Sequence, residues 1–248
     1  MTERAEAFLV SRTMQAIELL SFQHASAPQV ADALRVHPGT SRRLLNRLVS
    51  DGWLTRSDGY RRTYAPTMRI VAMAAQLTAR DPLLVAARPI VTRLHRETGG
   101  VAHLCIPSYR SALCLVHRAG GPDVRPQLRE LVPAHAAAAG KLLLGYRDAW
   151  RASVLAQPLQ RLTPETVVDP ARIEREAAVT VERGYAFEDR EFQPEVRGVA
   201  VPVRAVDGAV AASLALNGPT HELPDEAVEG TAALLRARAD ELERALAA

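Results

Sequence analysis

Cysteine is scarce in this chain of 248 residues, which contains only Cys105 and Cys114. Two cysteines cannot build the disulfide framework of a small secreted domain, and no Cys and His spacing resembles a zinc site. Both cysteines lie in apolar, strand-like stretches, where we expect buried thiols in a reducing compartment. The pattern therefore argues against a secreted, disulfide-rich fold and against a structural metal.

Long apolar stretches are also missing. No window of about 20 residues is both apolar and free of charge, as a membrane-spanning helix requires. Residues 1–6 are polar and lack the apolar segment of a signal peptide. We therefore expect a cytoplasmic protein that does not bind a membrane.

Catalytic motifs are absent as well. The sequence has no G-x-S-x-G, no phosphate-binding loop and no cluster of metal ligands. His135, Lys141 and Glu188 are candidate catalytic groups, but an enzyme needs a base, a nucleophile or a metal within mutual reach. His135 precedes a predicted helix, where a cap or a packed side chain is the commoner role. Glu188, Asp189 and Glu191 fit the solvated end of a strand as well as a ligand contact. We predict no enzyme and no cofactor.

The composition describes a globular chain whose positive charge is concentrated at one end. Hydrophobic residues make up 48% and charged residues 24%, and the length suggests two domains. Residues 1–66 contain nine Arg against six Asp and Glu, whereas the remainder contains 22 basic and 22 acidic residues. The formal net charge of +3 thus lies in the first segment. This distribution favours a nucleic-acid partner for that segment.

The first two predicted helices span residues 4–21 and the segment that opens at Ala27-Pro28. The first helix places Val10, Met14, Ile17 and Ser21 on one face, with Leu20 beside it. In the second helix, Val30, Ala31 and Leu34 point inward, and Pro28 suits the first turn.

A third helix, over residues 40–51, has one apolar and one basic face. His37-Pro38-Gly39-Thr40 supplies the stop and restart signals, with Gly39 or Thr40 as the N-cap, and Gly52 ends the helix. The apolar stripe consists of Leu44, Leu45, Leu48 and Val49. The opposite side carries Arg42, Arg43, Asn46, Arg47 and Ser50. Arg and Asn side chains are suited to bidentate reading of guanine and adenine.

A basic hairpin follows this helix. Trp53–Arg56 alternates like a strand, Ser57-Asp58-Gly59 forms a turn, and Tyr60–Tyr64 returns. Its arginines would reach phosphates or a minor groove. A helical hairpin with a solvated basic face would explain any single arginine, but the whole order predicts a winged helix-turn-helix over residues 1–66. The predicted DNA-binding residues are Thr40, Arg42, Arg43, Asn46, Arg47, Arg56, Arg61 and Arg62.

The remaining chain predicts a linker helix over residues 67–81 and an α+β domain over residues 82–248. Helices are expected at 82–97, 136–145, 148–156, 170–183 and 224–246. Strands are expected at 101–107, 112–117 and from 184, and 196–205 and 209–216 form a hairpin that turns at Val206-Asp207-Gly208. This mixture indicates helices packed on an antiparallel sheet.

Several ordered motifs give the chain a resemblance to the IclR family of bacterial transcriptional regulators, from about Thr13 to Leu246. The N-terminal motifs are Val30-Ala31-Asp32-Ala33-Leu34, Arg43-Leu44-Leu45 and Gly52-Trp53-Leu54. The C-terminal motifs are Pro133-Ala134-His135 to Ala139-Gly140-Lys141, Arg183-Gly184-Tyr185-Ala186, Glu191-Phe192 with 196–203, and 213–219. The resemblance implies a GAF-like effector-binding domain, a homodimer or homotetramer, and small-molecule control of promoter binding.

The resemblance also implies where the effector binds. In this family a small acid sits beside the start of the helix that corresponds to residues 136–145, where free N–H groups and the helix dipole favour an anion. By position in the motifs, the effector-binding residues are Val132, Ala138, Ala139, Glu188, Val196, Gly198, Ala215 and Asn217. Many members carry Cys at Gly198 and Ser at Ala215 and Asn217. We therefore expect a roomier, less polar pocket that favours a larger, partly apolar acid, such as an aromatic one, over a keto acid of two or three carbons.

Together these features predict a ligand-responsive repressor of a catabolic operon, bound to double-stranded DNA at a pseudo-palindromic operator. Repressor is the commoner role in the family, and an activator is the alternative. A winged-helix protein whose C-terminal domain only oligomerises is a further alternative.

Overall fold

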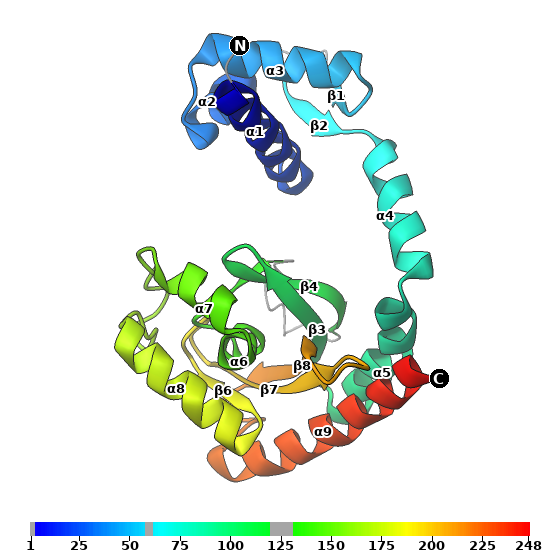
Figure 1. Ribbon diagram of the computed structural model, residues 1–248, viewed down its shortest axis with the longest axis vertical. Helices are drawn as coiled ribbons and strands as arrows, with labels where there is room; N and C mark the ends of the chain where they lie inside the picture. The colour runs from blue at the N-terminus through cyan, green and yellow to red at the C-terminus, as the bar shows by residue number, and fades with distance from the viewer. Residues whose placement is uncertain (1–2, 58–61, 120–130) are drawn as a thin grey trace. The chain divides into compact units, whose positions relative to one another are not determined.

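The computed structural model describes residues 3–57, 62–119 and 131–248 (Figure 1). Packing divides the chain into two compact units, Met1–Ala79 and Arg80–Ala248. Each unit has its own buried apolar core, so each is described separately.

The first unit is a winged helix-turn-helix. Its elements are α1 (Glu3–Phe22), α2 (Ala27–Leu34), α3 (Pro38–Ser50), β1 (Leu54–Arg56), β2 (Tyr64–Pro66) and α4 (Met68–Arg80). The strands β1 and β2 pair antiparallel. The core of this unit is formed by Ala16, Leu20, Ala25, Val30, Leu34, Leu44, Leu45, Leu48, Leu54 and Tyr64. The inward positions predicted for α2 and for the three leucines of α3 are confirmed.

The buried face of α1 differs from the prediction. Val10 and Met14 are 65% and 62% exposed, whereas Ala16 and Leu20 are buried. Apolar residues occur on more than one stripe of this helix, so periodicity alone did not identify the inward stripe. Contacts with α2 and β2 select the face that carries Ala16 and Leu20.

The wing returns later than predicted. β2 begins at Tyr64, which pairs with Arg56, while Tyr60 and Arg61 lie outside the described residues. Before β2, Ser57 and Thr63 join the two sides, because the N–H of Ser57 donates to the carbonyl of Thr63 at 2.9 Å. Tyr64 also donates its N–H to the carbonyl of Ala25 at 2.9 Å. This bridge holds the return strand against the segment between α1 and α2.

The second unit is an α+β domain, which confirms the predicted fold class. Its helices are α5 (Pro82–Thr98), α6 (Ala138–Tyr146), α7 (Asp148–Leu155), α8 (Pro170–Arg183) and α9 (Asp225–Ala247). Its strands are β3 (Val101–Ser108), β4 (Ser111–Arg118), β5 (Leu131–Pro133), β6 (Ala186–Asp189), β7 (Val196–Arg204) and β8 (Val210–Pro219). They form one antiparallel sheet in the order β5-β4-β3-β8-β7-β6.

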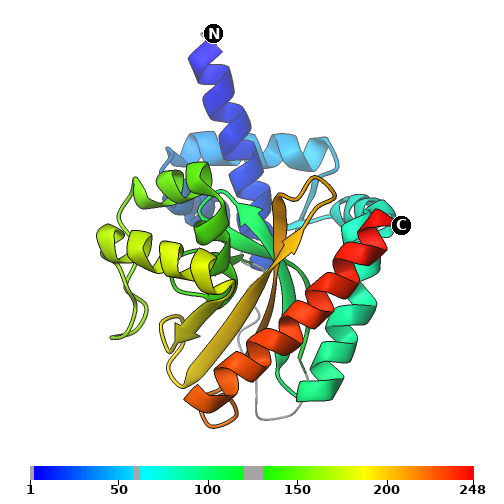
Figure 2. The ribbon, with the colours of Figure 1, turned by 60° about the horizontal axis from the view of Figure 1, so that its bottom comes forward.

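Helices cover both faces of this sheet. Figure 2 shows α5 and α9 running side by side along one face. The main core lies there, and it includes the predicted inward residues Leu84, Ala87, Ile90, Val91 and Leu94 of α5. On the opposite face α6 packs across β6, β7 and β8, and α7 and α8 pack against α6. The face under α6 therefore carries the predicted effector residues.

The start of α6 was predicted two residues too early. Residues 134–137 form a turn after β5, and the N–H groups of Ala136 and Ala137 point to the carbonyl of Pro133 at 3.4 and 3.1 Å. The helix then begins at Ala138. An alanine-rich sequence carries no local start signal, so the boundary depends on this turn.

Within the described ranges, no single helix is long and apolar enough to cross a membrane. Only α4 and α5 taken together, as a bent pair broken at residue 81, have the length and composition for it.

Candidate functional site

The predicted reading helix, α3, begins at Pro38, earlier than predicted, with His37 as its N-cap. The Nδ1 atom of His37 accepts a hydrogen bond from the N–H of Gly39 at 3.1 Å. Pro38 occupies the first turn, where its missing N–H costs nothing. The predicted cap at Gly39 or Thr40 was wrong, and Thr40 lies half-buried in the first turn.

Ser41 is buried at an inward position of α3. Its Oγ donates to the carbonyl of Ala27 at 2.8 Å, at the start of α2. This bond satisfies a buried hydroxyl and ties the two helices of the motif together.

The outward face of α3 carries the predicted reading residues. Arg42, Arg43, Asn46 and Arg47 are exposed, opposite the buried leucines. Two of these side chains contact other residues of the same unit. The Nε of Arg47 donates to the Asp51 carboxylate at 2.8 Å, and the Tyr64 hydroxyl lies 3.5 Å from the Oδ1 of Asn46.

The wing contributes two exposed arginines that the structure describes. Arg56 lies at the end of β1, and Arg62 lies before β2. Arg61, the third predicted wing residue, lies outside the described residues. The geometry thus gives a basic helix face and a basic hairpin in one unit, which suits a major groove and adjacent phosphates.

At the predicted effector site, the carboxyl group of Glu188 occupies the start of α6. Its Oε2 accepts from the N–H of Ala138 at 3.1 Å, and its Oε1 accepts from the N–H of Phe192 at 3.3 Å. Glu188 is 0% exposed, so the reading as a solvated strand end was wrong for this residue. Burial raises the pKa of Glu188 to about 8, against the opposite effect of the two backbone bonds.

Other charges surround this carboxyl group. Lys141 forms ion pairs with Glu191 and with Glu176, the latter at 3.1 Å. Glu191 is buried too, and burial raises its pKa while Lys141 opposes the shift. Asp189, on the other face of β6, bonds to Arg190 and to Arg197, and these bonds lower its pKa.

Gly198 does not open the wall of the site, contrary to the expectation of a roomier pocket. Gly198 pairs with Asn217 between β7 and β8. A Cβ atom built at Gly198 would lie 2.8 Å from the Nδ2 of Asn217. The longer side chain of Asn217 therefore fills the volume that the glycine leaves.

The structure brings most of the remaining predicted effector residues together. Val132, Ala138, Ala139 and Ala215 belong to one apolar cluster under α6. Val196 lies at the start of β7, two residues before Gly198 and on the same face. The same cluster includes Cys105 and Cys114, which face each other across β3 and β4 as free thiols. A hydrogen bond with Cys114, together with burial, raises the pKa of Cys105 well above its usual value.

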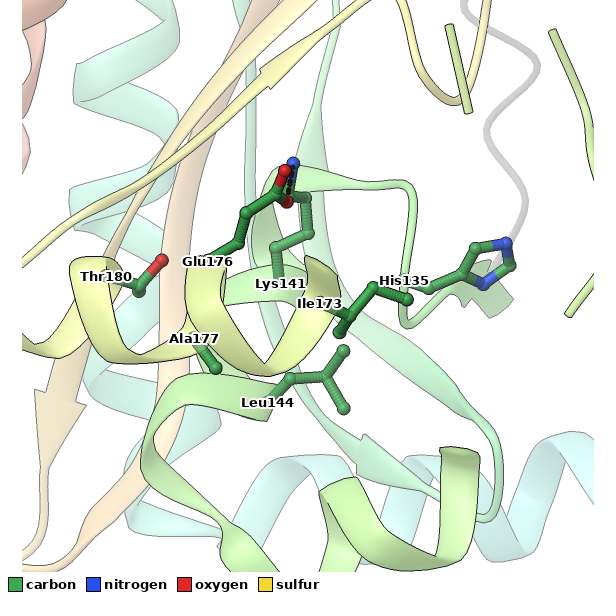
Figure 3. Close-up of a pocket in the computed structure, with 7 residues that line it drawn as sticks. All are labelled: His135, Lys141, Leu144, Ile173, Glu176, Ala177 and Thr180. Carbon is green, nitrogen blue, oxygen red and sulfur yellow. Dashed lines mark ion pairs between the residues drawn. The ribbon is translucent and has the colours of Figure 1, made fainter. Parts of the chain in front are cut away.

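Two pockets lie beside this cluster, along α8. Figure 3 shows the smaller one, of about 10 Å³, where Lys141 pairs with Glu176 beside His135, Leu144 and Thr180. This volume is no larger than one water. His135 is a packed side chain there, with its Nε2 2.9 Å from the carbonyl of Gln160. A groove of about 500 Å³ runs between α8 and β6.

No group of three or more His, Cys, Asp and Glu side chains could hold a metal ion in the part of the chain that the structure describes. The candidate site thus has two parts: a basic helix face in the first unit, and in the second unit an apolar cluster beside the buried carboxyl group of Glu188.

Comparisons with known proteins identify this combination. The family model of the C-terminal domain of bacterial IclR transcriptional regulators matches residues 75–244. The HTH-type transcriptional regulator BhcR of Paracoccus denitrificans is 26% identical over 223 residues, which cover 87% of this chain and 79% of that protein.

Two solved structures are similar over nearly their whole length. An IclR transcriptional regulator from a Silicibacter species has a TM-score of 0.84 and 26% identity, and the match covers 96% of each chain. An IclR homologue from Microbacterium hydrocarbonoxydans, solved with 4-hydroxybenzoate, has a TM-score of 0.78 and 26% identity over 96% of this chain and 98% of that one. Proteins of this kind are transcriptional regulators and not enzymes, and they bind DNA and small-molecule effectors. The chain belongs to the IclR family of bacterial transcriptional regulators.

Proposed function

We propose that this chain is a cytoplasmic, ligand-responsive repressor that binds the pseudo-palindromic operator of a catabolic operon. The observation that carries the proposal is the outward face of α3, where Arg42, Arg43, Asn46 and Arg47 are exposed opposite a buried apolar stripe. A helix with only a solvated outer face would not need four exposed side chains that can hydrogen-bond base edges, placed opposite a face that packs into the winged-helix core.

The wing and the first turn of α3 supply contacts that carry no sequence information. Arg56, Arg61 and Arg62 bind phosphates, and Thr40, at the start of α3, hydrogen-bonds the DNA backbone. Each phosphate that an arginine neutralises releases counterions, so binding weakens as the salt concentration rises. Base reading therefore falls to the four side chains on the outward face of α3.

Exposed apolar residues support a dimer, or a tetramer built from dimers. No residue of α4 is buried, and Met68 and Leu77 are 74% and 70% exposed. Such a helix favours a second copy of itself, because pairing removes apolar surface from water. In the dimer two α3 helices read successive major grooves about 34 Å apart. Sedimentation of the purified chain measures this state, and a monomer at micromolar concentration would contradict it.

The effector that we propose is a small organic acid, with an aromatic one favoured. The Microbacterium hydrocarbonoxydans homologue, whose structure contains 4-hydroxybenzoate, supports this class. The effector site consists of Val132, Ala138, Ala139, Glu188, Val196, Gly198, Ala215 and Asn217. An acid at Ala138 must replace the Glu188 carboxyl group there. The buried Glu188 also favours the alternative, in which the C-terminal domain only oligomerises.

Arg43→Ala tests the reading face. Duplexes are first selected in vitro from a random library by the wild-type chain. A bidentate contact to a base contributes about 1–3 kcal/mol of discrimination, so we expect the affinity for selected DNA to fall about tenfold while random DNA is bound nearly as before. Gel-shift titrations at fixed salt measure both affinities.

Arg88→Ala is the matched control, because it removes the same charge from an exposed position on α5. Equal losses on selected and random DNA in Arg43→Ala would mean that Arg43 contacts only phosphate. Selection that enriches no sequence would contradict the proposed function itself.

A further inference from the structure

Hydrogen bonds and a cation–π contact join the start of the linker helix α4 to the residues at and just after the C-terminal end of the reading helix α3. The N–H of Thr67 donates to the carbonyl of Trp53 at 2.9 Å, and its Oγ1 donates to the carbonyl of Gly52 at 2.8 Å. The Nη1 of Arg69 donates to the carbonyl of Asp51 at 3.0 Å. The same guanidinium lies 4.0 Å from the ring centroid of Trp53. These four contacts are called the Thr67–Arg69 clamp.

The clamp uses groups that a helix end leaves free. The last carbonyls of an α-helix have no partner within the helix, and that end carries a partial negative charge. Asp51 is the C-cap of α3, and Gly52 follows with a φ of +75° that turns the chain toward the wing. The Arg69 guanidinium satisfies the carbonyl of the C-cap Asp51, and the Thr67 hydroxyl satisfies the carbonyl of Gly52 just beyond the helix. The cation also stacks on Trp53.

Beyond its first turn, α4 has little else to hold it. No side chain of α4 is buried among the described residues, and Met73 and Leu77 remain exposed. The clamp therefore supplies the side-chain contacts that join α4 to the rest of the winged helix.

The helical path is interrupted at the other end of α4. Asp81 is extended, with φ −73° and ψ 116°, and its carboxylate accepts from the N–H of Leu84 at 3.0 Å as the N-cap of α5. Pro82 follows, and its ring excludes a helix that continues from α4. Leu84 already belongs to the core of the second unit. The break between the two helices thus lies at Asp81, next to the boundary between the units after Ala79, and not at Thr67.

We propose that Thr67 and Arg69 are positioning residues that make α4 a rigid extension of the winged helix, so that the clamp sets the spacing at which a dimer reads its two half-sites. The inference rests on the proposed DNA-binding function. The link reaches the reading face directly, because Asp51 offers its carbonyl to Arg69 and its carboxylate to Arg47, at 3.0 and 2.8 Å. Effector-induced movement at Asp81 would then turn α4 and α3 together.

Thr67→Val and Arg69→Ala, each made in the full chain, test the clamp. Valine keeps the shape of Thr67 and removes the bond to Gly52. The probes are a selected full site, the same site with its half-sites moved apart by half a helical turn, and a single half-site. The wild type should prefer the native spacing by more than tenfold. Each variant should lower this preference at least threefold and leave binding to the single half-site unchanged.

Arg80→Ala is the matched control, since it removes a cation from the last turn of α4, far from the clamp in sequence. It should keep the spacing preference of the wild type. Unchanged preference in both clamp variants would overturn the inference while the proposed function stands. Parallel loss on the half-site would also overturn it, because the two residues would then only support the fold. A wild type that selects no DNA would overturn both proposals.

Discussion

The carboxyl group of Glu188 lies in the interior of the effector-binding domain, where it accepts a hydrogen bond from the N–H of Ala138 at the start of α6. The sequence could identify this residue as a candidate ligand contact, through its place in a motif. It could not show that the side chain bonds to the chain itself, because β6 and the start of α6 are about 50 residues apart and meet only in the folded sheet. Similarly, the contact of Asn217 with Gly198 depends on the register of β7 and β8.

Glu188→Gln should change how stability depends on pH. The pKa of Glu188 is about 8 in the folded chain and about 4.3 when unfolded, so the folded state binds more protons between these values. Its contribution is therefore fully present below about pH 4 and is lost as the pH rises through 8. We expect the free energy of unfolding of the wild type, relative to the variant, to fall by up to about 1.4 kcal/mol per pH unit in this window.

Urea unfolding at several pH values between 5 and 8.5 measures this difference. Lys141, Glu176 and Glu191, the charged groups beside the site, are present in both proteins and largely cancel. Asp189→Asn is the pH-independent control in this window, since the lowered pKa of Asp189 means that its stabilising contribution is lost only as the pH falls below its unfolded pKa of about 3.9. A difference between wild type and Glu188→Gln that does not change with pH would contradict the buried carboxyl group.

At the scale of single elements, the sequence predicted best where start and stop signals are local. α8 was predicted with both ends correct, because Asp169 caps it, Pro170 begins it and Gly184 ends it with a φ of +76°. The strand hairpin that turns at 206–208 is confirmed for the same reason. The buried face of α1 and the start of β2 were wrong, because tertiary contacts decide between several locally acceptable alternatives.

Gly140→Ala should destabilise the effector-binding domain. A Cβ at this glycine would lie 2.5 Å from the Cα and carbonyl oxygen of Ala134. Backbone atoms cannot move aside cheaply, so overpacking by about 1–3 kcal/mol should exceed the gain in helix propensity of about 1 kcal/mol. Thermal and urea unfolding measure the sum.

Gly230→Ala is the matched control for this substitution. Gly230 lies in α9 with nothing within 4 Å of a built Cβ, so only the propensity gain remains. We expect the control to be stabilised by about 0.5–1 kcal/mol. A Gly140→Ala chain as stable as the wild type would show that the turn at Ala134 yields to the added methyl group.

For the whole molecule, the charge distribution and the sequence pattern together predicted two domains of different kinds. The positive excess lies in residues 1–66, where the structure has a winged helix-turn-helix, and the balanced remainder folds as an α+β domain. The class of regulator followed from ordered motifs in both parts. The effector did not follow, because the volume and polarity of its site depend on side chains that meet across β6, β7 and β8.

The most direct measurement is the affinity of the purified chain for its selected DNA, with and without each member of a panel of small carboxylic acids that includes 4-hydroxybenzoate. An acid can change the DNA affinity only if it binds the DNA-bound and DNA-free states of the protein with different affinities. The free energy of such coupling is typically about 1–3 kcal/mol. We predict that one acid, an aromatic one, lowers the DNA affinity about fivefold or more in a saturable manner. Tight, sequence-selective DNA binding that no acid in the panel changes would contradict a ligand-responsive repressor.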